Sequence, residues 1–275
     1  MKFGEFYAFA ESFAPIKYSE EFCARYGAYD NSGMLVDCKN EVTGVVFCLD
    51  LSEAAVRYAV EKGASVVVTH HPAIYAKIAK LEEGGCGSAV LCAAKHGLSV
   101  ASLHLNLDAA PGGIDESLAD GVKRAAAAAC GKAYVPSANE KIMYGFSTAE
   151  GGYGRVYDVE KTSARLLKEA FDKEFGGKGH TLLFGAEDKT VGRVASFCGA
   201  GADEQSIAYA LKNGADMIVS SDFKHHLLRE AVLSGAVVLC PTHYLSENYG
   251  FFKFYKKIAE ATEIPCFYYG EDELL

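Results

Sequence analysis

The chain has 275 residues, of which 50% are hydrophobic and 23% are charged, and its formal net charge is -9. This composition is typical of a folded globular protein with a substantial core, and it argues against a disordered chain. The negative charge disfavours broad binding to nucleic acid or to an anionic membrane surface. A local basic pocket for a phosphorylated small molecule is compatible with it.

The sequence contains no apolar stretch long enough to predict a transmembrane helix, and the first residues lack the layout of a secretory signal. The nine cysteines are odd in number and scattered, without a C-x-x-C pair. Small buried thiols explain them better than disulfides or a thiolate metal site. We therefore expect a cytoplasmic protein in a reducing compartment.

The first elements in chain order predict a strand–helix–strand unit. An apolar run at 44–50 predicts a buried strand, and Ser52 is placed to cap the helix that follows. The next apolar run, 65–69, predicts a second buried strand, and a crossover of this kind implies that the two strands are parallel. A helix at 88–96 and a strand at 98–103 extend the pattern.

The second half of the sequence repeats this unit. Residues 53–69 align without gaps on residues 204–220, and a Gly-Ala pair falls at the same place in both segments. In this alignment the corner after residue 69 corresponds to Ser221 and Asp222. We expect an α/β fold with two similar lobes of mostly parallel sheets, which face each other across a metal-binding cleft.

We assign residues 1–130 to the first lobe and residues 191–275 to the second. Residues 131–190 are predicted to form a connecting strand–helix segment. The glycine- and lysine-containing stretch 176–179 lacks the spacing of a phosphate-binding loop, so we interpret it as a plain turn.

Clusters of histidine and carboxylate residues directly follow the predicted strands 65–69 and 98–103 and a third apolar run, 236–241, at the strand ends where the chemistry of open α/β sheets gathers. In the first cluster, Pro72 restricts the backbone of the preceding histidine. The candidate metal ligands are His70, His71, Asp108, His243 and Glu247.

Each candidate also has an ordinary explanation when it is considered alone. Asp108 could cap a turn, and an i,i+4 pair such as His243 and Glu247 is common on helix surfaces. Together, however, three imidazoles and two carboxylates exceed one tetrahedral site and suit two divalent ions that share a bridging group. Glu247 is the expected bridge, a water or hydroxide between the ions is the expected nucleophile, and zinc, iron and manganese all accept these ligands.

Two further histidines are candidates for catalysis. His104 follows the predicted strand at 98–103, and we expect it to contact substrate or to support the ligands rather than to bind metal itself. His226 follows Asp222 at a predicted helix start, where it could act as an acid–base group. A histidine satisfied at a sheet edge and a solvated helix start are the alternatives.

Four motifs give the chain a resemblance to the Nif-three-like family, many members of which are named type 2 GTP cyclohydrolase I homologues. The motifs are T-H-H-P at 69–72, H-L-N-L-D-A-A-P-G-G at 104–113, D-F-K-H-H at 222–226 and H-Y-L-S-E at 243–247. An early Y-D-N-S-G element at 29–33 is similar to the family's W-D-N-x-G. The resemblance covers nearly the whole chain and implies a two-lobed α/β fold, a dinuclear metal site between the lobes and a toroidal hexamer.

Carried onto this sequence, the resemblance assigns metal binding to the five candidate ligands and places His104 and His226 near the metals. We predict that the protein is a dinuclear metal-dependent hydrolase that acts on a small molecule. The predicted reaction is of the GTP cyclohydrolase type or is the hydrolysis of a nucleotide or phosphoester. The alternative is a non-catalytic metal-binding scaffold or regulatory protein. A third interpretation, a manganese-dependent phosphoesterase, is weakened because Thr69 stands where that class needs an aspartate.

Overall fold

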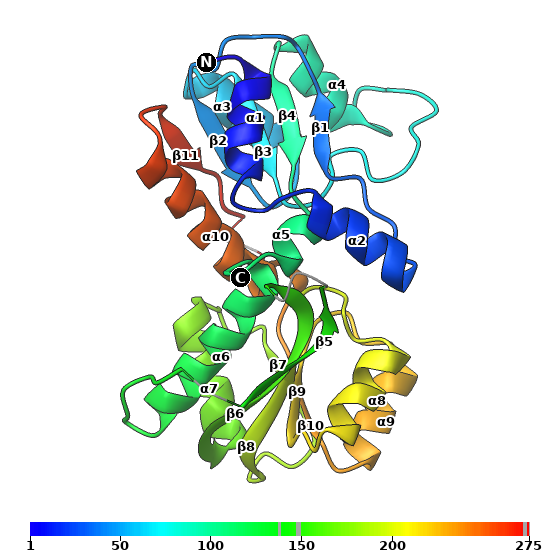
Figure 1. Cartoon of the computed structure of the whole chain (residues 1–275), viewed down its shortest axis with the longest axis vertical. Coiled ribbons are helices and arrows are strands. Elements are labelled where there is room, and N and C mark those ends of the chain that lie inside the picture. The colour runs from blue at the N-terminus through cyan, green and yellow to red at the C-terminus, as the bar shows by residue number, and fades with distance from the viewer. Residues whose placement is uncertain (137–138, 147–149, 272–273, 275) are drawn as a thin grey trace. The chain divides into compact units, whose positions relative to one another are not determined.

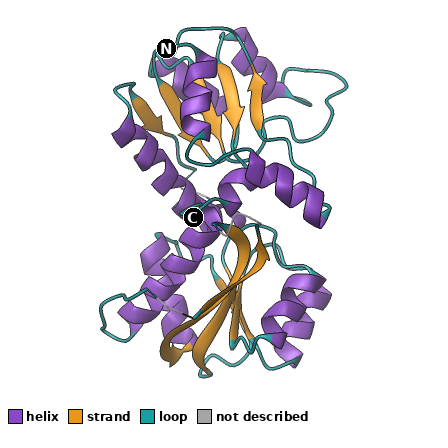
Figure 2. Ribbon diagram, in the orientation of Figure 1, coloured by secondary structure: helices purple, strands orange, loops and turns teal. Residues whose placement is uncertain are grey.

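The chain forms two compact units, each built on one β-sheet with helices packed against it (Figures 1 and 2). The computed structural model describes residues 1–136, 139–146, 150–271 and 274. Residues 1–110 and 251–270 make the first unit, and residues 111–250 and 271–275 make the second.

The first sheet has five strands in the order β1-β4-β3-β2-β11. The strands are β1 (Gly33–Val36), β2 (Val45–Cys48), β3 (Val66–Thr69), β4 (Ser99–Ser102) and β11 (Cys266–Tyr268). Only the β1–β4 pair is antiparallel, so this sheet is mostly parallel as predicted. β2, β3 and β4 are buried throughout, which explains why their sequences are continuous apolar or small-residue runs rather than alternating patterns.

Five helices lie wholly within the first unit. They are α1 (Phe3–Glu11), α2 (Lys17–Tyr26), α3 (Glu53–Glu61), α4 (Ser88–Lys95) and α5 (Leu105–Ala109). The Ser52 side chain accepts a hydrogen bond from the backbone N–H of Ala55 at 3.1 Å, so the predicted cap of α3 is confirmed.

Successive side chains of β2 point to opposite faces of the sheet, and both faces are covered. Val46 and Cys48 pack in a cluster with residues of α3 and α4. The Phe47 ring lies 6.3 Å from the ring of Phe251 and 6.2 Å from that of Phe254, between ring centroids. Both partners belong to α10 (His243–Ala261), so the second part of this helix is core of the first unit.

The second sheet has six strands in the order β5-β6-β8-β9-β10-β7. The strands are β5 (Glu140–Gly145), β6 (Gly152–Ser163), β7 (Leu182–Phe184), β8 (Thr190–Ser196), β9 (Met217–Val219) and β10 (Val237–Cys240). β8, β9 and β10 are parallel, whereas the other neighbours pair antiparallel. This sheet is therefore mixed, and the expectation of a mostly parallel sheet holds only for its centre.

Within the described residues of the second unit, four α-helices lie wholly inside it: α6 (Ile114–Ala129), α7 (Ala164–Phe175), α8 (Glu204–Lys212) and α9 (His225–Leu233). Figure 1 shows α6 and α7 on one side of the sheet and α8 and α9 on the other. Ile207 of α8 and Leu227 of α9 are fully buried against strand residues such as Ile218. Among the described residues, no helix combines the length and the apolar character needed to cross a membrane.

The duplicated segments occupy equivalent places in the two units. Residues 53–69 contain α3 and β3, and residues 204–220 contain α8 and β9. In each unit the strand before the helix pairs in parallel with the strand after it, as the predicted crossover requires. The same local pattern therefore builds the centre of both sheets.

The boundaries of the units differ from the predicted segments. Residues 111–129, expected in the first lobe, lie in the second unit because α6 packs on α7 and β6. The stretch 131–190, expected to connect the lobes, supplies four elements of the second unit, including the strands β5 and β6. Residues 251–270, expected in the second lobe, belong to the first unit.

Candidate metal centre

Three histidines of the first unit gather at the carboxyl ends of β3 and β4. These strands are parallel neighbours, and Thr69 is in register with Ser102. The next residues along each strand therefore reach the same edge of the sheet. The His70 ring lies 4.9 Å from the His71 ring and 5.2 Å from the His104 ring, between centroids.

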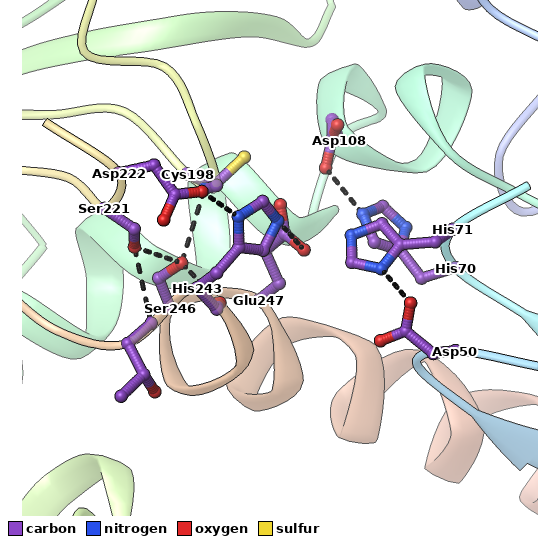
Figure 3. Close-up of polar contacts among 12 residues, drawn as sticks. Asp50, His70, His71, Asp108, Cys198, Ser221, Asp222, His243, Ser246 and Glu247 are labelled. Carbon is purple, nitrogen blue, oxygen red and sulfur yellow. Dashed lines mark hydrogen bonds and ion pairs between the residues drawn. The ribbon is translucent and has the colours of Figure 1, made fainter. Parts of the chain in front are cut away.

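An oxygen atom holds each of these imidazoles at Nδ1 (Figure 3 shows the contact of His71 with Asp50). The distances are 2.9 Å from His70 to the Leu103 carbonyl, 2.8 Å from His71 to Asp50 and 2.8 Å from His104 to Asp30. A carboxylate or carbonyl oxygen accepts the Nδ1 proton, so the Nε2 atom of a neutral ring keeps its lone pair. Metal-bound histidines are held in this way by the oxygens around them.

Asp108 adds a carboxylate to the histidines. It lies in α5, is only 4% exposed, and its Oδ1 atom is 3.4 Å from the Nε2 atom of His70. His70, His104 and Asp108 each offer one ligand atom, and these atoms lie within 4.8 Å of one another. This is a group that could hold a divalent ion, and it includes His104, which the sequence predicts to contact substrate or to support the ligands rather than to bind metal itself.

The side chain of Asp30, which is 2% exposed, holds His104 in place. Besides His104, its carboxylate accepts hydrogen bonds from the hydroxyls of Ser19 at 2.5 Å and Ser32 at 2.6 Å. Burial opposes ionisation of Asp30, but the hydrogen bonds from His104 and the two serines outweigh it and lower the pKa of Asp30 to about 2. Asp30 is therefore charged at neutral pH and favours a proton on Nδ1 of His104.

The lowered pKa of Asp30 predicts a specific acid sensitivity. The ionised Asp30 side chain stabilises the folded chain fully above about pH 4, which is near the pKa of an aspartate in the unfolded chain. This contribution is lost as the pH falls toward 2. Between pH 5 and pH 3 the free energy of unfolding should fall by about 1 kcal/mol more in the wild type than in Asp30→Asn. Urea denaturation at each pH measures this difference, and identical pH dependence in the two proteins would contradict it.

In the second unit, His243 and Glu247 lie on one face of the first turns of α10. The Nε2 atom of His243 is 3.1 Å from a Glu247 carboxylate oxygen, which confirms the geometry expected from the i,i+4 spacing. The Nδ1 atom of His243 lies 2.6 Å from Asp222 Oδ2 (Figure 3). Asp222 follows β9, and β9 is the parallel neighbour of β10, which leads into His243.

Glu247 is buried, and a glycine makes room for it. Its residue exposure is 3%. Gly199, in the turn after β8, has a φ of +56°, and a Cβ atom added there would overlap the Glu247 carboxylate. The Sγ atom of buried Cys198 lies within 4.8 Å of that carboxylate. Glycine at 199 therefore avoids both a strained left-handed conformation and an overlap with Glu247.

Alanine substitutions should separate these two requirements. Gly214 also has a positive φ, +73°, but nothing lies within 4 Å of an added Cβ atom. We expect Gly214→Ala to lower the free energy of unfolding by about 1–2 kcal/mol, the usual cost of that conformation. Gly199→Ala should lower it by about 3 kcal/mol or more, because overlap with Glu247 adds to that cost. Equal losses in denaturant titrations would show that the carboxylate moves aside freely.

The structure places His226 at the start of α9, in a solvent-exposed position. Its side chain is 64% exposed, and its Nε2 atom is 3.7 Å from Glu204 of α8. Its catalytic assignment stays a prediction.

The sequence analysis did not predict that aspartates orient the histidines. Asp50 precedes its partner His71 by 21 residues, and Asp222 precedes His243 by the same number. In both cases a helix and a strand lie between the two residues, so each aspartate ends the strand beside the one that presents the histidine. An aspartate at a strand end, one helix–strand unit before a histidine, is the signal that could have found them.

The protein thus has an α/β fold with two mixed β-sheets, and histidines and carboxylates that could bind metal lie at the ends of central strands in both. A model of the family described as Duf34/NIF3 (NGG1p interacting factor 3) matches residues 1–269. The chain therefore belongs to the NIF3 family, and the resemblance seen in its motifs is confirmed.

Individual relatives match along nearly the whole chain. The protein named GTP cyclohydrolase 1 type 2 homolog of Clostridium perfringens is 26% identical over 264 residues, which cover 94% of this chain and 92% of that protein. A crystal structure of a Staphylococcus aureus hypothetical protein has a TM-score of 0.78 at 22% identity and covers 98% of this chain and 96% of its own. A Bacillus cereus protein related to NIF3 has a TM-score of 0.76 at 18% identity, with the same coverage. These structures support the α/β fold with two mixed sheets.

Proposed function

We propose that the protein is a metal-dependent hydrolase that uses two divalent ions. The proposed ligands are His70, His71, Asp108, His243 and Glu247. The observation that carries the proposal is the anchoring of imidazoles at Nδ1 in both units, with Nε2 of His70 beside the Asp108 carboxylate and Nε2 of His243 beside the Glu247 carboxylate.

The donor set fits divalent ions of intermediate softness. Imidazole nitrogens and carboxylate oxygens together suit zinc, iron and manganese. Three imidazoles and two carboxylates are more ligands than one tetrahedral ion takes. The five residues would hold two ions, with Glu247 as the proposed bridging ligand.

The other residues would bind substrate and move protons. Divalent ions supply Lewis acidity and lower the pKa of water that they bind. His104, held by the charged carboxylate of Asp30, would exchange a proton with substrate at Nε2, and His226 is the second candidate for that role. The substrate class is a small molecule such as a nucleotide, in line with relatives named GTP cyclohydrolase 1 type 2 homolog.

The cellular setting and assembly are part of the proposal. None of the nine cysteines, all of which lie among the described residues, is in a disulfide, which supports a reducing cytoplasm. We propose a homo-oligomer, with a toroidal hexamer as its form, and no broad contact with nucleic acid or membrane.

Assembly is tested by multi-angle light scattering on the purified protein. A mass of about six chains of 29.5 kDa each is expected at micromolar concentration. A species of one chain's mass across the accessible concentrations would contradict the hexamer.

Metal content tests the ligand set. Elemental mass spectrometry should find about two ions per wild-type chain, most of them lost in Glu247→Ala because the proposed bridge is gone. Glu260→Ala, an exposed carboxylate change on the same helix, serves as the control and should keep the wild-type content. Unchanged metal in Glu247→Ala, with circular dichroism showing a folded chain, would remove Glu247 from the ligand set.

Turnover decides whether the metal centre is catalytic. The metal-loaded wild type should hydrolyse a member of a panel of nucleotides and phosphoesters that begins with GTP. A protein that binds two ions and converts nothing in the panel would favour the alternative, a non-catalytic metal-binding scaffold or regulator.

A further inference from the structure

Two exposed tyrosines of the first unit stand beside the candidate metal ligands. Tyr29 is 58% exposed and Tyr75 is 50% exposed. Their rings lie 5.3 Å apart between centroids and are nearly perpendicular, at 88°. The Tyr75 ring is also perpendicular to the His104 ring, with centroids 6.2 Å apart. A pair of large rings is therefore open to solvent next to the proposed proton-transfer histidine.

The polar contacts that hold His104 also fix the segments that carry these tyrosines. The Asn31 side chain donates a hydrogen bond to the carbonyl of Ile74, which ties the segment after Tyr29 to the residue before Tyr75. The backbone N–H of His104 donates to the Ser32 hydroxyl at 2.9 Å, two positions from Asp30. The tyrosine backbones are thus positioned relative to the imidazole, while their rings stay half in solvent.

We propose that Tyr29 and Tyr75 form a stacking surface that binds the planar heteroaromatic ring of the substrate, a purine base in a nucleotide. This inference rests on the proposed function and names the part of the substrate that the site recognises. Perpendicular rings let a planar ligand stack on one face while its edge meets the second ring. Stacking on tyrosine is a common way for proteins to hold a base.

The position of the pair explains what stacking would achieve. A base on Tyr75 lies next to the imidazole of His104, whose ring is the neighbour of Tyr75. The base would then be oriented toward the histidine–carboxylate group rather than only attracted to it. The tyrosines are positioning residues for the ring, and the phosphates of the nucleotide do not depend on them.

Isothermal titration calorimetry of the zinc-loaded protein tests this assignment, with GTP and inorganic tripolyphosphate as the probes. Tyr75→Leu should weaken GTP binding about tenfold, since it removes a stacking face. Tyr75→Phe keeps the ring and should bind GTP within about twofold of the wild type. Tripolyphosphate has no ring, so its affinity should be the same in all three proteins.

Two controls make each outcome decisive. Phe252→Leu changes an exposed aromatic residue elsewhere in the first unit and should leave GTP binding unchanged. Zinc content is measured in every variant, so loss of metal is separated from loss of stacking. The stacking surface would be overturned if the zinc-loaded single variants Tyr75→Leu and Tyr29→Leu both bound GTP with wild-type affinity. It would also be overturned if the zinc-loaded wild type did not bind GTP. A wild type that takes up no zinc would instead overturn the proposed function.

Discussion

The centre depends on one interaction, the hydrogen bond between the Nδ1 atom of a histidine and a fixed oxygen. An imidazole on its own can rotate and can carry its proton on either nitrogen. Asp50 fixes both properties for His71, and Asp222 fixes them for His243. Each hydrogen bond fixes the orientation of the imidazole and keeps the proton on Nδ1. The lone pair of Nε2 then points in a fixed direction, as metal binding requires.

The parallel strands at the centre of each sheet provide these bonds. Because neighbouring parallel strands end at the same edge, a carboxylate after one strand reaches a histidine after the next. The first unit uses β2 and β3 for this purpose, and the second uses β9 and β10. The antiparallel strands added at the sheet edges leave this arrangement untouched, which explains how a mixed sheet keeps the geometry of a parallel one.

The sequence predicted the parts of the structure that are local. The crossover from β2 to β3, the cap at Ser52 and the shared face of His243 and Glu247 all follow from spacing over a few residues. The sequence did not predict to which unit residues 111–129 and 251–270 belong, because this depends on packing between segments far apart in the chain. For the same reason the role of Asp30, whose partner His104 lies 74 residues away, was not predictable from local pattern.

X-ray absorption spectroscopy of the zinc-loaded protein tests the central claim most directly, because it reports the ligand atoms themselves. Our account predicts a shell of nitrogen and oxygen at about 2.0–2.1 Å with outer-shell scattering from imidazole, and a second zinc at about 3.5–4 Å. A shell dominated by sulfur at about 2.3 Å, or one without imidazole scattering, would contradict it, because the oriented histidines would then not be the ligands.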